Sequence, residues 1–151
     1  MNPLVPVAVF GTQAALMMVD ELHFHRRRRL PRWERIGHPL DTATVLVCYG
    51  TALTLAPGPG ALRFYLAAAI GSCLFVTKDE FVHAKLCDPA EHWLHAVLFL
   101  LHPVVLTLVA LLWTEGGHGP LLAVQGMVTL AFGLYQTVYW NRPWKQPSFE
   151  R

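Results

Sequence analysis

Long apolar stretches alternate with short polar segments along this chain of 151 residues. Such stretches predict membrane helices, because about 20 helical residues cross the roughly 30 Å hydrocarbon layer of a bilayer. The stretches lack the alternation of strands, and only helices or closed barrels can span lipid. We therefore expect five helical spans, of which the second and third need their polar flanks to reach full length: 4–25, 41–56, 61–83, 90–114 and 120–141.

The composition supports a membrane protein. Apolar residues make up 54% of the chain and charged residues only 15%, whereas a soluble domain carries about 25% charged residues. The cysteines are odd in number, and Cys48 and Cys73 lie inside apolar runs, which disfavours a disulfide framework. We exclude a disordered chain, a secreted disulfide scaffold and a nucleic-acid-binding domain. We predict one all-α integral membrane domain over residues 1–151, whose first four helices form a four-helix bundle.

Basic residues gather on one side of the predicted membrane. With five spans, eleven of the twelve Lys and Arg residues fall on that side and only Arg63 on the other. Basic segments stay in the cytoplasm, so we expect the N-terminus outside and the C-terminus inside the cytoplasmic (inner) membrane. The first stretch has no basic residue before it, which favours a membrane helix over a cleaved signal peptide. The same side holds a basic run that could also bind lipid phosphate and an aromatic belt: Arg26–Arg29, Tyr135, Tyr139, Trp140 and Trp144.

Carboxylates and imidazoles collect at the same helix ends, in pairs three or four residues apart. Residues at this spacing share a helix face, and antiparallel helices joined by short loops would bring the faces together. The pairs are Glu21 with His25, His38 with Asp41, Asp79 and Glu80 with His83, and Glu91 and His92 with His95. Ionisable groups within spans usually face a cavity or each other, so we expect the pairs to converge.

One of these pairs, Glu80-Phe81-Val82-His83, is a Glu-x-x-His unit. It resembles the units with which ferritin-like di-iron and di-manganese proteins build sites inside four-helix bundles. The set also resembles the histidine-rich sites of membrane fatty-acid desaturases and hydroxylases, although their longer histidine boxes are absent. The resemblance covers short segments only. It implies two metal ions held between four helices.

A metal site is the interpretation that we favour. The predicted ligands are Glu21, His25, Asp41, Glu80, His83, Glu91 and His95, with His38, Asp79, His92 and Cys87 as weaker candidates. These are too many for one zinc ion, whose catalytic form uses three protein ligands. Mixed imidazole and carboxylate ligands suit two transition-metal ions, iron before zinc or manganese.

Some of these residues have structural alternatives. Asp88-Pro89-Ala90-Glu91 reads as a helix cap, with a capping-box glutamate at its end. Asp41 could lie in the first turn of a helix that begins after Pro39, where the helix macrodipole stabilises an acidic side chain. Asp20 and Asp79 could pair with neighbouring Arg and Lys residues.

Two weaker patterns concern the helices themselves. The first and third stretches end alike, in Val19-Asp20-Glu21 and Lys78-Asp79-Glu80, which suggests two related hairpins. Gly126 and Gly133 share a face of the last helix and could pack against another helix or against a second copy of the chain. His102 precedes a proline and would either line a cavity or bond a carbonyl freed by a kink.

Three classes of function follow. The first is a di-iron oxidoreductase acting on a lipid or quinone-like substrate that enters sideways from the bilayer, with an unidentified redox partner; with zinc the site would hydrolyse lipid instead. The second is a b-type haem electron carrier, with His83 or His25 opposite His95 or His102 as axial ligands. The third is a metal transporter or sensor, which we disfavour because only His102 lies deeper. Nothing supports nucleic acid as a partner.

Overall fold

The structure, a computed structural model, describes Asn2 and residues 4–142. Trp144, Lys145 and Arg151, which entered the predicted aromatic belt and charge bias, lie outside these residues. The described part is all helical. Its elements are α1 (Leu4–Val19), the π-helix η1 (Asp20–His25), α2 (Arg26–Arg28), α3 (Arg32–Thr54), α4 (Pro59–Val76), the 3₁₀-helix η2 (Thr77–Asp79), α5 (Glu80–Leu86), α6 (Pro89–Glu115) and α7 (Gly119–Trp140).

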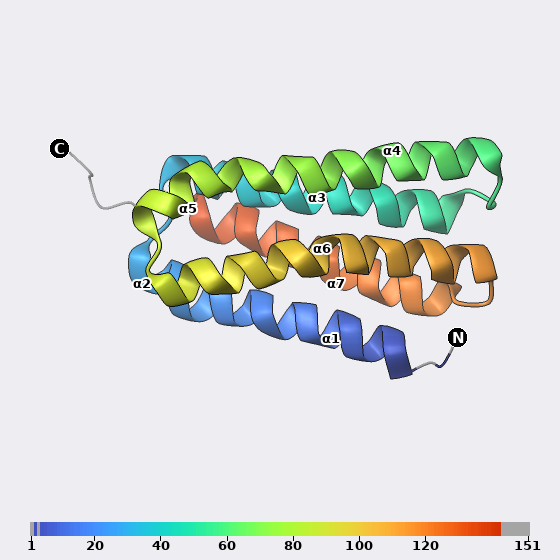
Figure 1. The fold of residues 1–151 in the computed structure, drawn as a ribbon, viewed down its shortest axis with the longest axis horizontal. Helices are drawn as coiled ribbons and strands as arrows, with labels where there is room; N and C mark the ends of the chain where they lie inside the picture. Colours follow the sequence, from blue (N-terminus) through green and yellow to red (C-terminus); the bar gives the residue numbers. More distant parts are fainter. Residues whose placement is uncertain (1, 3, 143–151) are drawn as a thin grey trace.

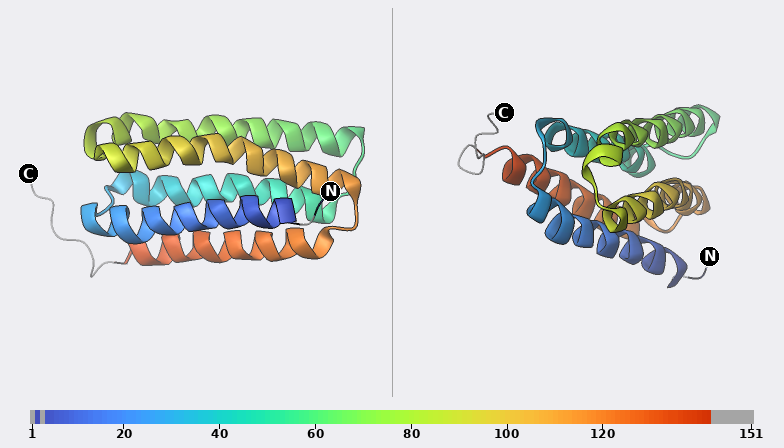
Figure 2. Two further views of the ribbon diagram at one scale, coloured as in Figure 1. Left: turned by 60° about the horizontal axis from the view of Figure 1, so that its bottom comes forward. Right: turned by 60° about the vertical axis from the view of Figure 1, so that its left-hand side comes forward.

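The helices run side by side along one long axis (Figure 1). α1 continues through η1 into α2, and α4 continues through η2 into α5, so that each forms one long helical stretch. α3 packs against α7, α4 and α6, while α1 packs mainly against α6. Figure 2 shows α3 between the α4–α6 pair and the α1 and α7 helices. The chain therefore consists of two consecutive antiparallel pairs of helical stretches, which we call the first hairpin (α1–α3) and the second hairpin (α4–α6), and of α7, which packs against α3. In the first hairpin α1 packs mainly against α6 of the second rather than against α3.

Apolar side chains occupy both the interior and the outward surface. The buried cluster centres on the halves of the helices away from α2 and α5, and includes Tyr49, Tyr65, Val109 and Leu112. Large apolar side chains are also exposed along the whole length, such as Leu4, Ile70, Leu74, Leu100 and Met127. A soluble protein rarely exposes a contiguous apolar surface of this extent, so lipid is the fitting solvent.

Four helical stretches are long and apolar enough to cross a membrane by length and composition: Leu4–Arg28, Pro59–Leu86, Pro89–Glu115 and Gly119–Trp140. α3 is not among them, although we predicted a span at 41–56. It begins at Arg32 rather than at Asp41, and its first turns carry Glu34, Arg35 and His38, which lower its mean hydropathy. The chain is thus consistent with a membrane protein, and a fifth span remains a prediction.

Helix boundaries correct one structural alternative and confirm only the Asp88 cap of the other, because the Glu91 side chain bonds Arg28. Asp41 lies inside α3, so it is not in a first helical turn and the macrodipole does not explain it. At the start of α6, the Asp88 carboxylate accepts hydrogen bonds from the backbone N–H groups of Ala90 and Glu91, as an N-cap does. Asp88 is therefore the cap, and the Glu91 side chain is turned to another partner.

The glycines of α7 serve the packing of this chain. A Cβ at Gly133 would lie 2.7 Å from Thr42 Cγ2 of α3, which is closer than packed atoms approach. Gly126 of α7 lies against Tyr49 of α3. Thr42 also donates a hydrogen bond to Gln136 Oε1 at 3.1 Å. The small residues that we considered for a subunit contact therefore allow α3 and α7 to approach.

Candidate metal centre

Most of the buried ionisable side chains lie at one end of the molecule, which we call the polar end. It is formed by η1, the first turns of α3, the η2–α5 segment and the first turns of α6, on the left in Figure 1. Eight of its side chains are at most 8% exposed: Asp20, Glu21, His25, Glu34, Asp79, His83, Glu91 and His95. Buried charges are costly unless they are paired or bind an ion, so this cluster is the candidate functional site.

A π-helical turn shapes the first part of the site. In a π-helix, residues five apart are hydrogen-bonded neighbours, and in η1 this brings His25 Nε2 to 3.2 Å from Asp20 Oδ2. His25 Nδ1 lies 3.4 Å from Glu21 Oε2. The other Glu21 oxygen accepts hydrogen bonds from Tyr135 and Trp140 of α7, at 3.1 and 2.7 Å. Such π-turns within longer helices are frequent at functional sites.

Residues of both hairpins converge on Asp20. His95 Nε2 of α6 lies 3.0 Å from Asp20 Oδ1, so this carboxylate contacts an imidazole of each hairpin. Together with Glu91 these residues form a buried group in which one possible ligand atom of each lies within 4.8 Å of the others. We call this group the first ligand set: Asp20, His25, Glu91 and His95. Two imidazoles and two carboxylates suit iron, manganese or zinc.

A second group of the same composition adjoins the first. His83 Nε2 lies 3.7 Å from Glu34 Oε1, and His38 Nδ1 lies 3.8 Å from Asp79 Oδ2. These distances exceed those of hydrogen bonds. We call these residues the second ligand set: Glu34, His38, Asp79 and His83. Two pairwise approaches join them, whereas the ligand atoms of the first set all lie within 4.8 Å of one another. The His83 ring stacks on His95 of the first set, with ring centroids 4.0 Å apart.

The two hairpins carry the same pattern of residues. Asp20, His25, Glu34 and His38 of the first hairpin correspond in order to Asp79, His83, Glu91 and His95 of the second. The first hairpin has one residue more between its Asp and the following His, and the π-helix accommodates that residue. Each ligand set takes an Asp and the following His from one hairpin, and a Glu-x-x-x-His pair from the other.

Unpartnered buried atoms concentrate in these sets. Every residue of the second set has a buried side-chain atom without a hydrogen-bond partner: Glu34 Oε1, His38 Nε2, Asp79 Oδ1, and both ring nitrogens of His83. In the first set, His25 Nε2 has none either, because its approach to Asp20 lacks hydrogen-bond geometry. Buried polar groups in native proteins nearly always find a partner, so these atoms are available to a bound ion.

Two basic side chains neutralise part of the acidic charge. Arg28 Nη2 lies 2.8 Å from Glu34 Oε2 and 3.0 Å from Glu91 Oε1, and so joins one carboxylate of each set. Lys78 Nζ lies 2.7 Å from Asp41 Oδ1 and 2.9 Å from Asp79 Oδ2. The predicted pairing of Asp79 with a lysine is thus seen, whereas Asp20 pairs with histidines instead.

The structure does not bring every predicted ligand into the buried cluster. Glu80 lies 2.9 Å from His92, and their side chains are 45% and 41% exposed, so this pair lies outside the ligand sets. The Glu-x-x-His unit that suggested a ferritin-like site therefore contributes only His83, and the neighbouring Asp79 turns inward in place of Glu80. Glu21 is buried beside His25 but is held by α7.

Asp41 and Cys87 lie at the edges of the site. Asp41, His38 and Asp79 form a further group whose possible ligand atoms lie within 4.8 Å, but Lys78 binds both oxygens of Asp41. Cys87 follows the end of α5, and its Sγ lies 3.9 Å from His95 Nδ1. Burial, together with the nearby charge of Glu91, raises the pKa of the Cys87 thiol, which keeps the group neutral when no metal is bound.

Sequence reasoning missed Glu34 and underrated Asp20. Glu34 is fully buried, yet it lies in a basic segment that we assigned to a loop. One signal could have revealed it: Glu34 and His38 have the same four-residue spacing as Glu91 and His95. The predicted start of a helix at residue 41 hid this signal, because a four-residue spacing has meaning only within a helix.

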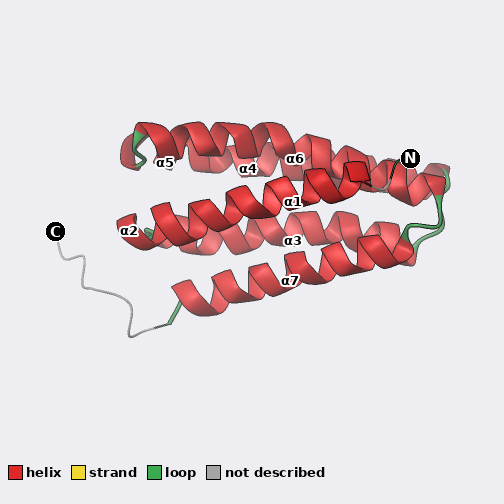
Figure 3. Ribbon diagram, turned by 90° about the horizontal axis from the view of Figure 1, so that it is seen from below, coloured by secondary structure: helices red, strands yellow, loops and turns green. Residues whose placement is uncertain are grey.

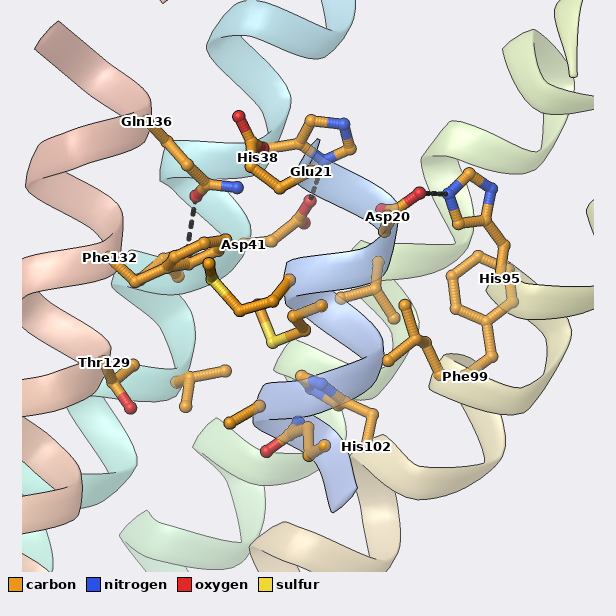
Figure 4. A pocket seen from close by; sticks show the side chains of 18 of the residues that line it. Asp20, Glu21, His38, Asp41, His95, Phe99, His102, Thr129, Phe132 and Gln136 are labelled. Carbon is orange, nitrogen blue, oxygen red and sulfur yellow. Dashed lines mark hydrogen bonds and ion pairs between the residues drawn. The ribbon is translucent and has the colours of Figure 1, made fainter. Parts of the chain in front are cut away.

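A cavity of about 250 Å³ extends from the ligand sets into the molecule. His38, His83, His95, Asp20 and Asp79 line its polar end. Figure 4 shows Asp20 and His95 pointing toward each other, and His38 pointing toward Asp41. The remainder is lined mostly by apolar side chains, Met17, Val45, Leu98, Phe99 and Phe132 among them. His102 lines the same cavity and hydrogen-bonds Ser72 at 2.9 Å, which favours the first of the two roles considered for it.

The sequence matches no protein-family model, and comparison with curated proteins and with solved structures finds no similar chain. What the site can do chemically therefore has to follow from the arrangement of its own residues.

Proposed function

We propose that this chain is a membrane-embedded di-metal protein in which each ligand set holds one transition-metal ion. The observation that carries the proposal is that five unpartnered buried atoms lie in the second set, directly beside a first set whose possible ligand atoms already lie within 4.8 Å of one another. Arg28 uses one oxygen of Glu34 and leaves the other, Oε1, for an ion. A lone structural ion-pair network would not leave both nitrogens of the buried His83 without partners.

We further propose an oxidoreductase that uses iron. A pair of histidines with carboxylates is the ligand type of non-haem iron oxygenases, and inward-facing Glu and His ligands from neighbouring helices are the arrangement of di-iron helical proteins. Bound iron would supply oxidation by dioxygen, with electrons from a donor protein or quinol. This chain would hold the substrate beside the ions and exclude water, because the site is buried and adjoins an apolar cavity.

The positions of the basic residues support a cytoplasmic site in the inner membrane. The polar end of the molecule, where α2, α5 and the end of α7 lie, carries Arg26, Arg27, Arg32, Lys85 and Arg142. Basic segments are retained in the cytoplasm. With α3 as a fifth span, the N-terminus lies outside, and the metal centre lies near the inner leaflet.

The geometry favours this function over the alternatives from other classes. The His83 and His95 rings are stacked with their centroids 4.0 Å apart, which leaves no space for a porphyrin between them. Between His25 and His95 lies the Asp20 carboxylate, at 3.2 and 3.0 Å from their Nε2 atoms, where a haem iron would have to bind. Zinc in the same sets would give a hydrolase, and only the identity of the metal separates it from the oxidoreductase. A transport path would need ligands at the far end, where the described residues offer an apolar core.

Metal content tests the proposal directly. The protein, purified in detergent and supplied in turn with Fe(II), Mn(II) and Zn(II), is expected to bind two ions per chain. After exposure of the iron form to dioxygen, charge-transfer absorption bands of ferric iron should appear. His83→Ala should lose the ion of the second set, and His25→Ala that of the first. The matched control is His92→Ala, a half-exposed histidine of the same region that contacts Glu80, and it should keep both ions.

The metal content of the wild-type protein and of the variants decides between the proposed functions. A folded wild-type chain that binds none of the three metals overturns the proposal, and so does a His83→Ala variant with unchanged metal content. Zinc bound in preference to iron, with hydrolysis of lipid esters, would replace the oxidoreductase with the hydrolase. Circular dichroism of each variant shows whether a loss of metal reflects a loss of fold.

A further inference from the structure

The cavity beside the ligand sets is long and narrow. Along α3 its lining runs from His38 to Tyr49, and along α7 from Gln136 to Gln125. Each of these two runs spans eleven residue steps of helix, so the cavity is about 16 Å long at a rise of 1.5 Å per residue. A volume of about 250 Å³ spread over that length leaves the width of one extended chain rather than of a fused ring system or a two-tailed lipid.

The cavity has one polar end and one apolar body. Carboxylates and imidazoles line the polar end, and Figure 4 shows Phe99 and Phe132 beyond them, followed by His102 and Thr129. An amphiphile of the leaflet at the polar end has the same arrangement, with its head at the membrane surface and its tail toward the bilayer centre. The cavity thus matches such a molecule in polarity, direction and width.

The cavity also reaches the lipid-facing surface. Met18 of α1 and Val128 of α7 both line it, yet they are 45% and 50% exposed. Figures 2 and 3 show α1 and α7 as neighbours on one side of the molecule. The two helices pack mainly against α6 and α3 respectively rather than against each other. An apolar tail can therefore enter sideways between α1 and α7.

The charge of the lining restricts the head group. Among the described residues, the cavity lining includes the carboxylates of Asp20, Glu21, Asp41 and Asp79 but no Lys or Arg. An anionic head would meet these carboxylates at close range and is disfavoured. A neutral head with hydroxyl groups can donate hydrogen bonds to the same oxygens and to imidazole nitrogens.

From these features we infer that the cavity binds a neutral single-chain amphiphile with a hydroxylated head, such as a long-chain alcohol or an isoprenoid quinol. The head lies among the ligand sets, and the tail extends past Phe99 toward Tyr49. As the substrate of the metal centre this ligand rests on the proposed function, but its binding does not require a metal ion. The atoms nearest the ions would be those of the head and the first carbons of the tail.

Photo-crosslinking tests the inference on metal-free protein. The probe is hexadecanol with a diazirine at the end of its tail, and the expected labels are Tyr49 and its neighbours in the cavity. Ala14→Trp, which fills the cavity from α1, should lower labelling by about tenfold or more. The matched control is Ala15→Trp, at the next position, which is exposed and does not line the cavity.

A second pair of variants and a competition complete the test. Thr129→Trp on α7 should act like Ala14→Trp, and Leu130→Trp, which is exposed, should act like its control. Unlabelled hexadecanol and a decyl-tailed benzoquinol should compete with the probe, and the stronger competitor identifies the head group. Palmitate should compete poorly.

Labels only on the outer surface, or equal labelling of the Ala14→Trp and Ala15→Trp variants, would overturn the cavity as the binding site. Equal competition by palmitate would overturn the selectivity for a neutral head.

The outcome is distinguishable from failure of the metal proposal. Labelling of the cavity in a protein that binds no metal would leave a lipid-binding protein without redox chemistry. Two bound ions without cavity labelling would leave a metal centre with a different substrate.

Discussion

The Asp20 carboxylate lies 3.0 Å from His95 Nε2, although 75 residues separate the two in the sequence. The contact joins the π-helical end of the first hairpin to the first turns of α6 in the second. Asp20 also approaches His25 of its own hairpin at 3.2 Å. One carboxylate thus couples the two halves of the chain at the site where we place the first metal ion.

Asp20→Asn tests this coupling. The substitution keeps the shape but removes the charge that two imidazoles approach, so we expect the metal-free protein to lose about 1–3 kcal/mol of unfolding free energy. Metal binding by the first set should weaken as well. Denaturant titration in detergent micelles measures the first effect, and elemental analysis the second. Unchanged stability and metal content would show that Asp20 is neither a ligand nor a link between hairpins.

Arg28→Gln tests the guanidinium that bridges Glu34 and Glu91. Removing it leaves two buried carboxylates without a cation. Because Arg28 is only partly buried, we expect a loss of unfolding free energy of roughly 3 kcal/mol, the lower end of the range for a broken buried ion pair. The control is Arg27→Gln, because Arg27 is exposed and its side chain bonds the exposed His23 rather than a buried carboxylate. Thermal unfolding of both variants should show a large shift for the first and little for the second.

Gly133→Ala tests the contact between α7 and α3. The added methyl group would lie 2.7 Å from Thr42 Cγ2, so one helix must shift, at a cost of about 1–3 kcal/mol. At Gly126 the same methyl group would meet Tyr49 at 3.6 Å, which is an ordinary contact. Gly126→Ala should therefore unfold close to the wild-type temperature. Equal unfolding temperatures of the two variants would contradict the close packing of Gly133 against Thr42.

His38 gives a pH dependence of stability in the metal-free protein. Burial disfavours its charged form, but the carboxylates of Asp41, Asp79 and Glu34 outweigh burial and raise the pKa of His38 above its ordinary value. Protonated His38 therefore stabilises the fold fully below the unfolded-state pKa near 6.5, and this contribution is lost as the pH rises through the raised native value. Groups of other elements also face His38: Asp79 of η2 lies 3.8 Å from its Nδ1, the His25 ring of η1 stacks on it, and Asp20 and His83 interact with it electrostatically.

The measurement is unfolding free energy against pH in the presence of a chelator, for wild type and His38→Gln. The wild-type protein should lose stability relative to the variant as the pH rises above about 6.5. A difference that stays constant with pH would show that His38 is uncharged in the native state. Bound metal should reverse the trend, because a ligating imidazole must be neutral.

Part of the site could be read from local spacing. His25, His83, Glu91 and His95 were predicted as ligands because each has a partner three or four residues away, and all four are buried in the ligand sets. The same rule chose Glu80 over Asp79, although both have acceptable spacing from His83. The 3₁₀ turn that ends at Asp79 rotates the chain, so that Asp79 faces inward and Glu80 meets His92 outside. Spacing does not reveal such a change of helix type.

The sequence by itself determined the helical character of the chain, its suitability for a membrane and the end of the helices at which its ionisable groups gather. These are properties of composition and of short-range periodicity, which every helix carries before it meets another. Only the tertiary structure decided which acids enter the cluster, that Glu34 belongs to it, and that the ligand sets take residues from both hairpins. Those features depend on how η1 winds and on which faces of α3 and α6 meet, and they follow from contacts between residues far apart in the chain.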